Sequence, residues 1–134
     1  MKPFIPKTVI LCITILFFQT ASAQVTDIEL QELKGEWKLD MSPQDTTDKN
    51  FAVMRINEID RSSVKGTFYR EGVKIKEGRV NIQLGIIYVA LVSGDNSGIY
   101  NTAFYYKDDK LYGTTHAVDR GFLSVWIAQK QPKN

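Results

Sequence analysis

The fold is decided by the C-terminal third of the chain, where three segments rich in Tyr, Phe, Val and Thr are separated by short polar turns. The segments are IYNTAFYYK (99–107), KLYGTTHAV (110–118) and FLSVWIAQ (122–129), joined by DD (108–109) and DRG (119–121). Aromatic and β-branched residues favour strands, and two- or three-residue linkers of this kind favour hairpins. The pattern therefore predicts three consecutive antiparallel strands.

Working outward from this stretch, the same pattern continues upstream. It predicts five more strands, at 34–40, 51–59, 63–70, 73–82 and 86–92, with polar loops at 41–50 and 93–98. The apolar phase of 73–82 slips from odd to even positions at Glu77-Gly78, which predicts a β-bulge. Eight strands in succession, without strand–helix alternation, predict an all-β, eight-stranded antiparallel up-and-down barrel. A two-sheet sandwich is the alternative.

A short helical turn is predicted before the first strand. Thr26-Asp27-Ile28-Glu29 has the spacing of a capping box, with Thr26 as the N-cap and Glu29 three residues later. Leu30 and Leu33 give the turn an apolar side, and Gly35 is its expected end. A helix this short is unstable alone, so it must pack against the strands.

The first 23 residues have the three-part layout of a secretory signal peptide. Lys2 and Lys7 precede an apolar run over 9–18, and small residues end the segment at Ala23. The run is shorter than the roughly 20 residues that a membrane span requires. We therefore expect residues 1–23 to be a signal peptide and 24–134 to form one extracytoplasmic barrel domain, periplasmic or secreted, with no membrane span after cleavage. Cleavage removes Cys12, the single cysteine, so the mature chain can form no disulfide.

The charge balance argues against a nucleic-acid partner. Two of the 17 basic residues and none of the 15 acidic residues lie in the predicted signal peptide, so residues 24–134 are formally neutral. Nucleic-acid and anionic-membrane binders usually carry a basic patch. The sequence shows no such patch.

Two short motifs carry a resemblance to a known group of barrels. Gly35-Glu36-Trp37 follows directly on the predicted helical turn, and Lys65-Gly66-Thr67-Phe68-Tyr69 lies in the third predicted strand. Both resemble motifs of the lipocalin and avidin group, the calycins. The resemblance implies a small secreted ligand-binding barrel. It also implies that the first-strand tryptophan packs near a late arginine, which is Arg120 by position.

A ligand site is predicted on one phase of the last four strands. The proposed ligand-binding residues are Tyr88, Asn101, Tyr105, Thr115 and Trp126. Small residues on the same phase would leave room in the lumen: Ala90, Ala103, Gly113, Ala117 and Ala128. This choice places an apolar phase on the outside, which implies a protein partner or homo-oligomer: Ile87, Val89, Leu91, Val125 and Ile127. With the phase reversed, the lumen would be a solid core.

No catalytic, metal or cofactor motif is expected. His116 is the only histidine and there is no mature cysteine, so a conventional zinc site cannot be assembled. An enzymatic alternative would need His116 beside a carboxylate such as Asp119 within a cavity. We expect instead a non-enzymatic, lipocalin-like barrel that binds a small, partly apolar ligand. The alternative is a protein-interaction or inhibitor module with a filled barrel and binding loops at 41–50 and 93–98.

Overall fold

The computed structural model describes residues 1–3 and 23–134. The predicted signal peptide lies mostly outside these residues and stays a prediction. The elements are α1 (Asp27–Glu32), β1 (Gly35–Asp40), β2 (Phe51–Ile59), β3 (Val64–Tyr69), β4 (Glu77–Asn81), β5 (Tyr88–Asp95), β6 (Gly98–Lys107), β7 (Lys110–Ala117) and β8 (Phe122–Lys130). The eight strands form one antiparallel sheet in the order β3-β2-β1-β8-β7-β6-β5-β4.

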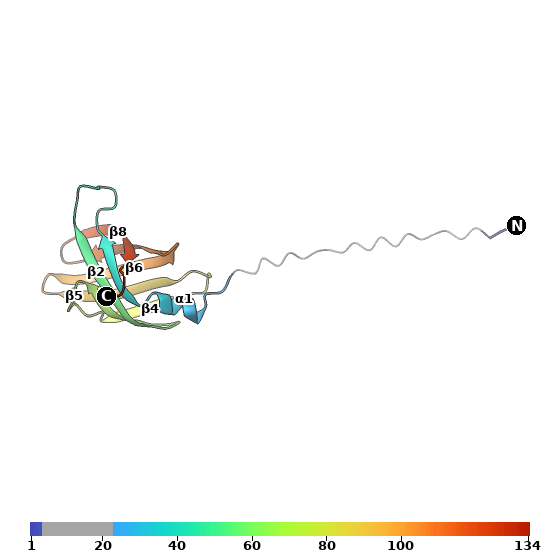
Figure 1. The fold of residues 1–134 in the computed structure, drawn as a ribbon, viewed down its shortest axis with the longest axis horizontal. Helices are drawn as coiled ribbons and strands as arrows, with labels where there is room; N and C mark the ends of the chain where they lie inside the picture. The colour runs from blue at the N-terminus through green and yellow to red at the C-terminus, as the bar shows by residue number, and fades with distance from the viewer. Residues whose placement is uncertain (4–22) are drawn as a thin grey trace.

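The sheet curls into a nearly closed barrel, with α1 packed at the end where β1 begins (Figure 1). The seam lies between β3 and β4, where only isolated bridges join Ser63 to Arg79 and Thr67 to Lys74. Three backbone hydrogen bonds also cross this region: Phe68 N to Val73 O and Ile75 N to Gly66 O, each at 2.9 Å, and Val80 N to Ser62 O at 3.1 Å. These contacts pair much of both edges, which confirms the predicted barrel over the sandwich.

The helical turn has the capping box that its sequence predicts. The Thr26 side chain accepts a hydrogen bond from Glu29 N, and the Glu29 carboxylate accepts one from Thr26 N. Leu30 and Leu33 are buried, and the indole Nε1 of Trp37 donates to Leu33 O at 2.9 Å. The turn therefore closes one end of the barrel and satisfies the buried indole.

The lumen is a packed apolar core. Its largest fully buried side chains include Trp37, Trp126 and Phe68, which lie with Met54 and Leu111 in one cluster. The Trp126 ring lies 6.2 Å from that of Phe68 and 5.8 Å from that of Phe104, centroid to centroid. Aromatic rings at these separations are in contact, so the centre of the barrel is filled.

The strand boundaries differ from prediction in two places. The expected strand 73–82 is shorter, because only Glu77–Asn81 pairs with β5 while Val73 and Ile75 point into the core beside β3. The expected loop 93–98 is largely strand, since β5 runs to Asp95 and β6 begins at Gly98. The polar composition of 93–98 is typical of a loop, but Ser93 is buried and pairs with Tyr100 in the sheet.

The irregularities implied by the sequence also lie elsewhere. A register shift occurs between Ile56 and Glu58, in the β2–β3 pair. The buried positions do change from odd to even numbers at Glu77-Gly78. This change lies at the start of β4, where the chain leaves its contact with β3, and not within a continuous strand. The Trp37–Arg120 contact does not form. Trp37 pairs in register with Lys130 at the α1 end, whereas Arg120 lies in the β7–β8 turn at the opposite end, over the Phe122 ring.

Candidate functional site

The five predicted ligand residues fall on opposite surfaces of the barrel. Thr115 and Trp126 point into the core, whereas Tyr88, Asn101 and Tyr105 are exposed on the outside. The prediction of one shared phase was therefore wrong. Register is the reason: Thr115 pairs with Thr102, so Asn101 shares its face with His116 instead.

The five apolar residues that we expected on the outside of the barrel are likewise divided between its inner and outer surfaces. Ile87, Val89 and Leu91 are buried, whereas Val125 is exposed and Ile127 half-buried on the outside. The side chains that face the lumen are therefore Val89 and Leu91 on β5, and Trp126 and Ala128 on β8.

Thr115 and Trp126 are joined in a buried hydrogen-bond chain. The Trp126 indole Nε1 donates to Thr115 Oγ1 at 3.0 Å, and the hydroxyls of Thr115 and Thr102 lie 3.0 Å apart. Trp126 also covers Gly113, where an added Cβ would come within 2.4 Å of the indole ring. Each of these three polar groups therefore has a hydrogen-bond partner inside the core.

The outer face of β5–β8 carries the residues best placed for binding. The register aligns its side chains in three cross-strand rows of four. The tyrosine row is Tyr88, Tyr105, Tyr112 and Ile127; the alanine row is Ala90, Ala103, Thr114 and Val125; the third row is Val92, Asn101, His116 and Leu123. None of these positions is Asp, Glu, Lys or Arg, in a chain in which 24% of residues are charged.

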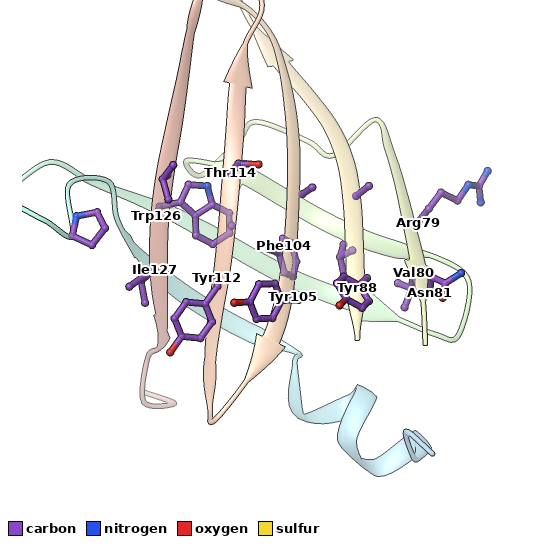
Figure 2. Close-up of a pocket in the computed structure, with 16 residues that line it drawn as sticks. Arg79, Val80, Asn81, Tyr88, Phe104, Tyr105, Tyr112, Thr114, Trp126 and Ile127 are labelled. Carbon is purple, nitrogen blue, oxygen red and sulfur yellow. The ribbon is translucent and has the colours of Figure 1, made fainter. Parts of the chain in front are cut away.

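The three tyrosines lie side by side on adjacent strands (Figure 2). The rings of Tyr105 and Tyr112 stack with centroids 5.4 Å apart and an interplanar angle of 18°, and Tyr88 lies 6.1 Å from Tyr105. Cross-strand aromatic pairs of this kind hold one another in place. The row is therefore a pre-formed ridge, with the much smaller alanine row beside it.

A hollow of about 770 Å³ lies over these two rows. Its exposed lining includes Tyr88, Tyr105, Ala90, Ala103 and Val125. Buried residues of the inward phase, Phe104 and Trp126 among them, lie beneath it.

Two smaller hollows continue this hollow across the barrel. One, of about 430 Å³, shares Pro43 and Ile127 with it; the other, of about 320 Å³, shares Arg79, Ala90, Ala103 and Thr114. The depression over the alanine row, which we call the trough, therefore continues toward Lys110 and Gln129 on one side and toward Val92 and Asn101 on the other.

Sequence reasoning missed Tyr112 and Thr114 in this surface, although a signal for them was present. Asp108 and Asp109 both have positive φ, as a two-residue type I′ turn requires, and the turn sets Lys107 opposite Lys110. Counting back along the hairpin places Tyr105 opposite Tyr112, which the turn alone predicts.

The barrel end opposite α1 is closed by a polar cluster. Arg70 Nη2 pairs with Asp95 Oδ2 at 2.9 Å, and the Tyr100 hydroxyl donates to Asp95 Oδ1 at 3.3 Å. Tyr69 packs on Tyr100 with ring centroids 4.9 Å apart. Burial, followed by the influence of Tyr69 and Asp95, raises the pKa of Tyr100. Nearby, the buried Ser93 Oγ has no hydrogen-bond partner among the described residues.

His116 and Asp119 do not form a catalytic arrangement. His116 is exposed in the third row, between Asn101 and Leu123. Asp119 instead accepts a hydrogen bond from Ile99 N at 2.9 Å and packs against Gly98, which fixes the neighbouring turn. Within 1–3 and 23–134, no three His, Cys, Asp or Glu side chains are grouped to hold a metal ion.

The loop at 41–50 is ordered by its own aspartates. Asp45 Oδ1 accepts hydrogen bonds from the backbone N–H and the hydroxyl of Thr47. The Asp48 carboxylate accepts a hydrogen bond from the Ser42 hydroxyl at 2.6 Å. The hydrogen bonds from Thr47 lower the pKa of Asp45. The loop extends beyond the strands in Figure 1, while Pro43 borders the trough. It is therefore a stiff wall of the trough.

Comparison of the chain with protein-family models, with curated proteins and with solved structures finds no match. Among the helices of the described part of the chain, none has the length and apolar character to cross a membrane.

Proposed function

We propose that this protein is a non-enzymatic, extracytoplasmic, lipocalin-like barrel that acts as a protein-interaction module through the outer face of β5–β8. The observation that carries the proposal is the uncharged set of three rows, in which Leu123 and Val125 are 63% and 59% exposed. Protein interfaces combine a core depleted in charge and rich in tyrosine with a polar rim. Glu77, Arg79 and Lys38 supply such a rim on the neighbouring strands.

The filled lumen also supports this function over a lumenal ligand carrier. The hydroxyl of Thr115 and the indole of Trp126 bond to each other within the core. Contacts to a partner must then come from the outer surface, and the tyrosine row offers rigid amphipathic side chains that lose little entropy on binding.

Site-specific photocrosslinking in the producing cells tests the proposal. A photoreactive phenylalanine at Tyr105 is expected to give defined protein crosslinks, whereas the same residue at Asn57, exposed on β2, is expected to give none. Ala103→Arg, which places a charge beside Tyr105, should remove the Tyr105 products. Equal labelling at both positions would contradict the proposal.

A small, partly apolar ligand is the second candidate, supported by the hollow of about 770 Å³. Small-molecule sites are typically about 300–1,000 Å³ and mainly apolar. Tyr88 and Tyr105, two of the five residues proposed from sequence, line its exposed surface, and Trp126 lies buried beneath it. Native mass spectrometry of the protein from its own cells tests this candidate: a small molecule should be bound to the folded form and released on unfolding. A bare chain that still gives the Tyr105 crosslinks would exclude it.

A further inference from the structure

The surface relief of the outer face repeats on β5, β6 and β7, whereas β8 carries Ile127 and Val125, which are similar in size. On β5 and β6 the large residue of the tyrosine row stands two positions from a small residue of the alanine row: Tyr88 with Ala90, and Tyr105 with Ala103. On β7 the pair is Tyr112 and Thr114. Residues two apart on a strand lie about 6.8 Å from each other on the same face. The face is therefore a ridge and a parallel trough, both crossing the strands.

A ridge beside a trough of matching length is self-complementary. A two-fold axis that runs across the strands, midway between the two rows, exchanges the rows. It places the tyrosine row of one copy over the alanine row of the other. Tyr105 then meets Ala103 of the second copy, and Ala103 meets its Tyr105. An axis along the strands would instead set ridge against ridge.

The charges around the face are compatible with the same axis. Arg79 borders the alanine row on β4, and Asn81 borders the tyrosine row on the same strand. The axis brings Arg79 against Asn81 of the second copy, so the two arginines do not oppose each other. The twelve positions of the three rows carry no Asp, Glu, Lys or Arg, and the axis sets Lys107 and Lys110 of the next row opposite Asn101 and His116 of the second copy.

The extent of the face is sufficient for a specific contact. With β4 and the next row, Lys107, Lys110 and Gln129, included, five strands at about 4.8 Å and four rows at about 6.8 Å span roughly 24 Å by 27 Å along the barrel wall, or about 650 Å². A rough surface buries more accessible area than its projection, and a stable interface needs about 800 Å² from each partner. The hollow of about 770 Å³ would receive the opposing tyrosines.

From these observations we propose that the occupant of the outer face is a second copy of this chain, in a symmetric dimer with ridge set into trough. The inference rests on the proposed function and names the partner at that same surface. β6 is the middle strand of β4–β8. The contact between Tyr105 and Ala103 therefore persists when the two twisted sheets cross at about 30°.

The test is sedimentation velocity of the protein, as processed by the cells that make it, from micromolar to hundred-micromolar concentration. The wild type should have twice the mass of one chain. Ala103→Arg should shift the dissociation constant upward by at least a hundredfold, giving single chains. Asn57→Arg adds the same charge on β2, away from the face, and should leave the dimer intact. Far-ultraviolet circular dichroism confirms that each variant is folded.

A second measurement tests the geometry itself. Residues 24–134 contain no cysteine, so Ala103→Cys combined with Tyr105→Cys introduces the only thiols of that range. Side chains two apart on one strand point in parallel, so these thiols favour pairing between copies over pairing within one chain. Mild oxidation should give a covalent dimer, in which each disulfide joins position 103 of one copy to position 105 of the other.

The outcomes separate this inference from the proposed function. A monomeric wild type, or a dimer that Ala103→Arg leaves intact, overturns the second copy as the occupant. A monomer that still gives Tyr105 crosslinks to a different protein overturns the dimer while leaving the interaction module standing. A monomer with a small molecule released on unfolding overturns both.

Discussion

Replacement of Trp126 by alanine tests whether the lumen is a packed core. Trp126 is fully buried, contacts the rings of Phe68 and Phe104, and donates its indole hydrogen to Thr115. Truncation removes roughly 150–200 Å² of buried apolar surface, which at about 25 cal/mol per Å² is about 4–5 kcal/mol. This agrees with the ~3–5 kcal/mol typical of tryptophan-to-alanine changes in cores.

Urea unfolding followed by far-ultraviolet circular dichroism measures this loss. We expect a decrease of about 4 kcal/mol in the free energy of unfolding, equivalent to roughly 15 °C in Tm for a domain of this size. Val118→Ala is the control, since Val118 is 41% exposed and lies outside the three rows of the outer face. Its effect should stay within about 0.5 kcal/mol.

A loss this large is a sizeable fraction of the stability of a small domain, so a milder variant keeps the test decisive. Trp126→Phe retains an aromatic ring but removes the indole donor, and should cost about 1–2 kcal/mol. The reasoning would be refuted if Trp126→Ala cost less than about 1 kcal/mol and resembled Val118→Ala. A lumen that tolerates this truncation would be loosely filled, and an internal ligand site would return to consideration.

Three further predictions follow from the core. Gly113→Ala should lower the free energy of unfolding in urea by about 1–3 kcal/mol, because the added Cβ would come within 2.4 Å of the Trp126 ring. An unchanged free energy of unfolding would mean that the ring moves freely aside. Thr115→Val leaves the buried indole hydrogen without an acceptor and should lower the free energy of unfolding by about 1–3 kcal/mol. Thr115→Ser keeps the hydroxyl and should lower it less. Equal losses for the two variants would argue against the hydrogen bond. Burial and the hydrogen bond to Asp109 raise the pKa of Tyr106 from 10.0 to about 12. Because the folded state favours the neutral phenol, its contribution to stability is complete below pH 10 and is lost as the pH rises toward 12. Tyr106→Phe should therefore weaken the alkaline loss of stability seen by circular dichroism, and an unchanged alkaline transition would contradict this assignment.

Local sequence patterns determined most of the architecture. The capping box at Thr26 and Glu29, the hairpin turn at Asp108 and Asp109, and β2 at Phe51–Ile59 all lie where the sequence predicts them. Each depends on interactions within a few residues, or on a period-two pattern that any pleated strand must follow. Strand number and order followed from these local rules, because short turns leave consecutive strands as neighbours.

Only the tertiary structure decided which phase of each strand faces the lumen. Period-two alternation defines two faces but does not name the inner one when both carry apolar residues, as they do from Tyr88 to Leu91. The hairpin register and barrel closure settle the choice: Leu91 and Thr102 turn inward with Thr115, while Tyr88 turns outward. The Tyr105–Tyr112 pair follows from the hairpin turn, but the ridge also needs Tyr88, which only the register between β5 and β6 brings into the same row.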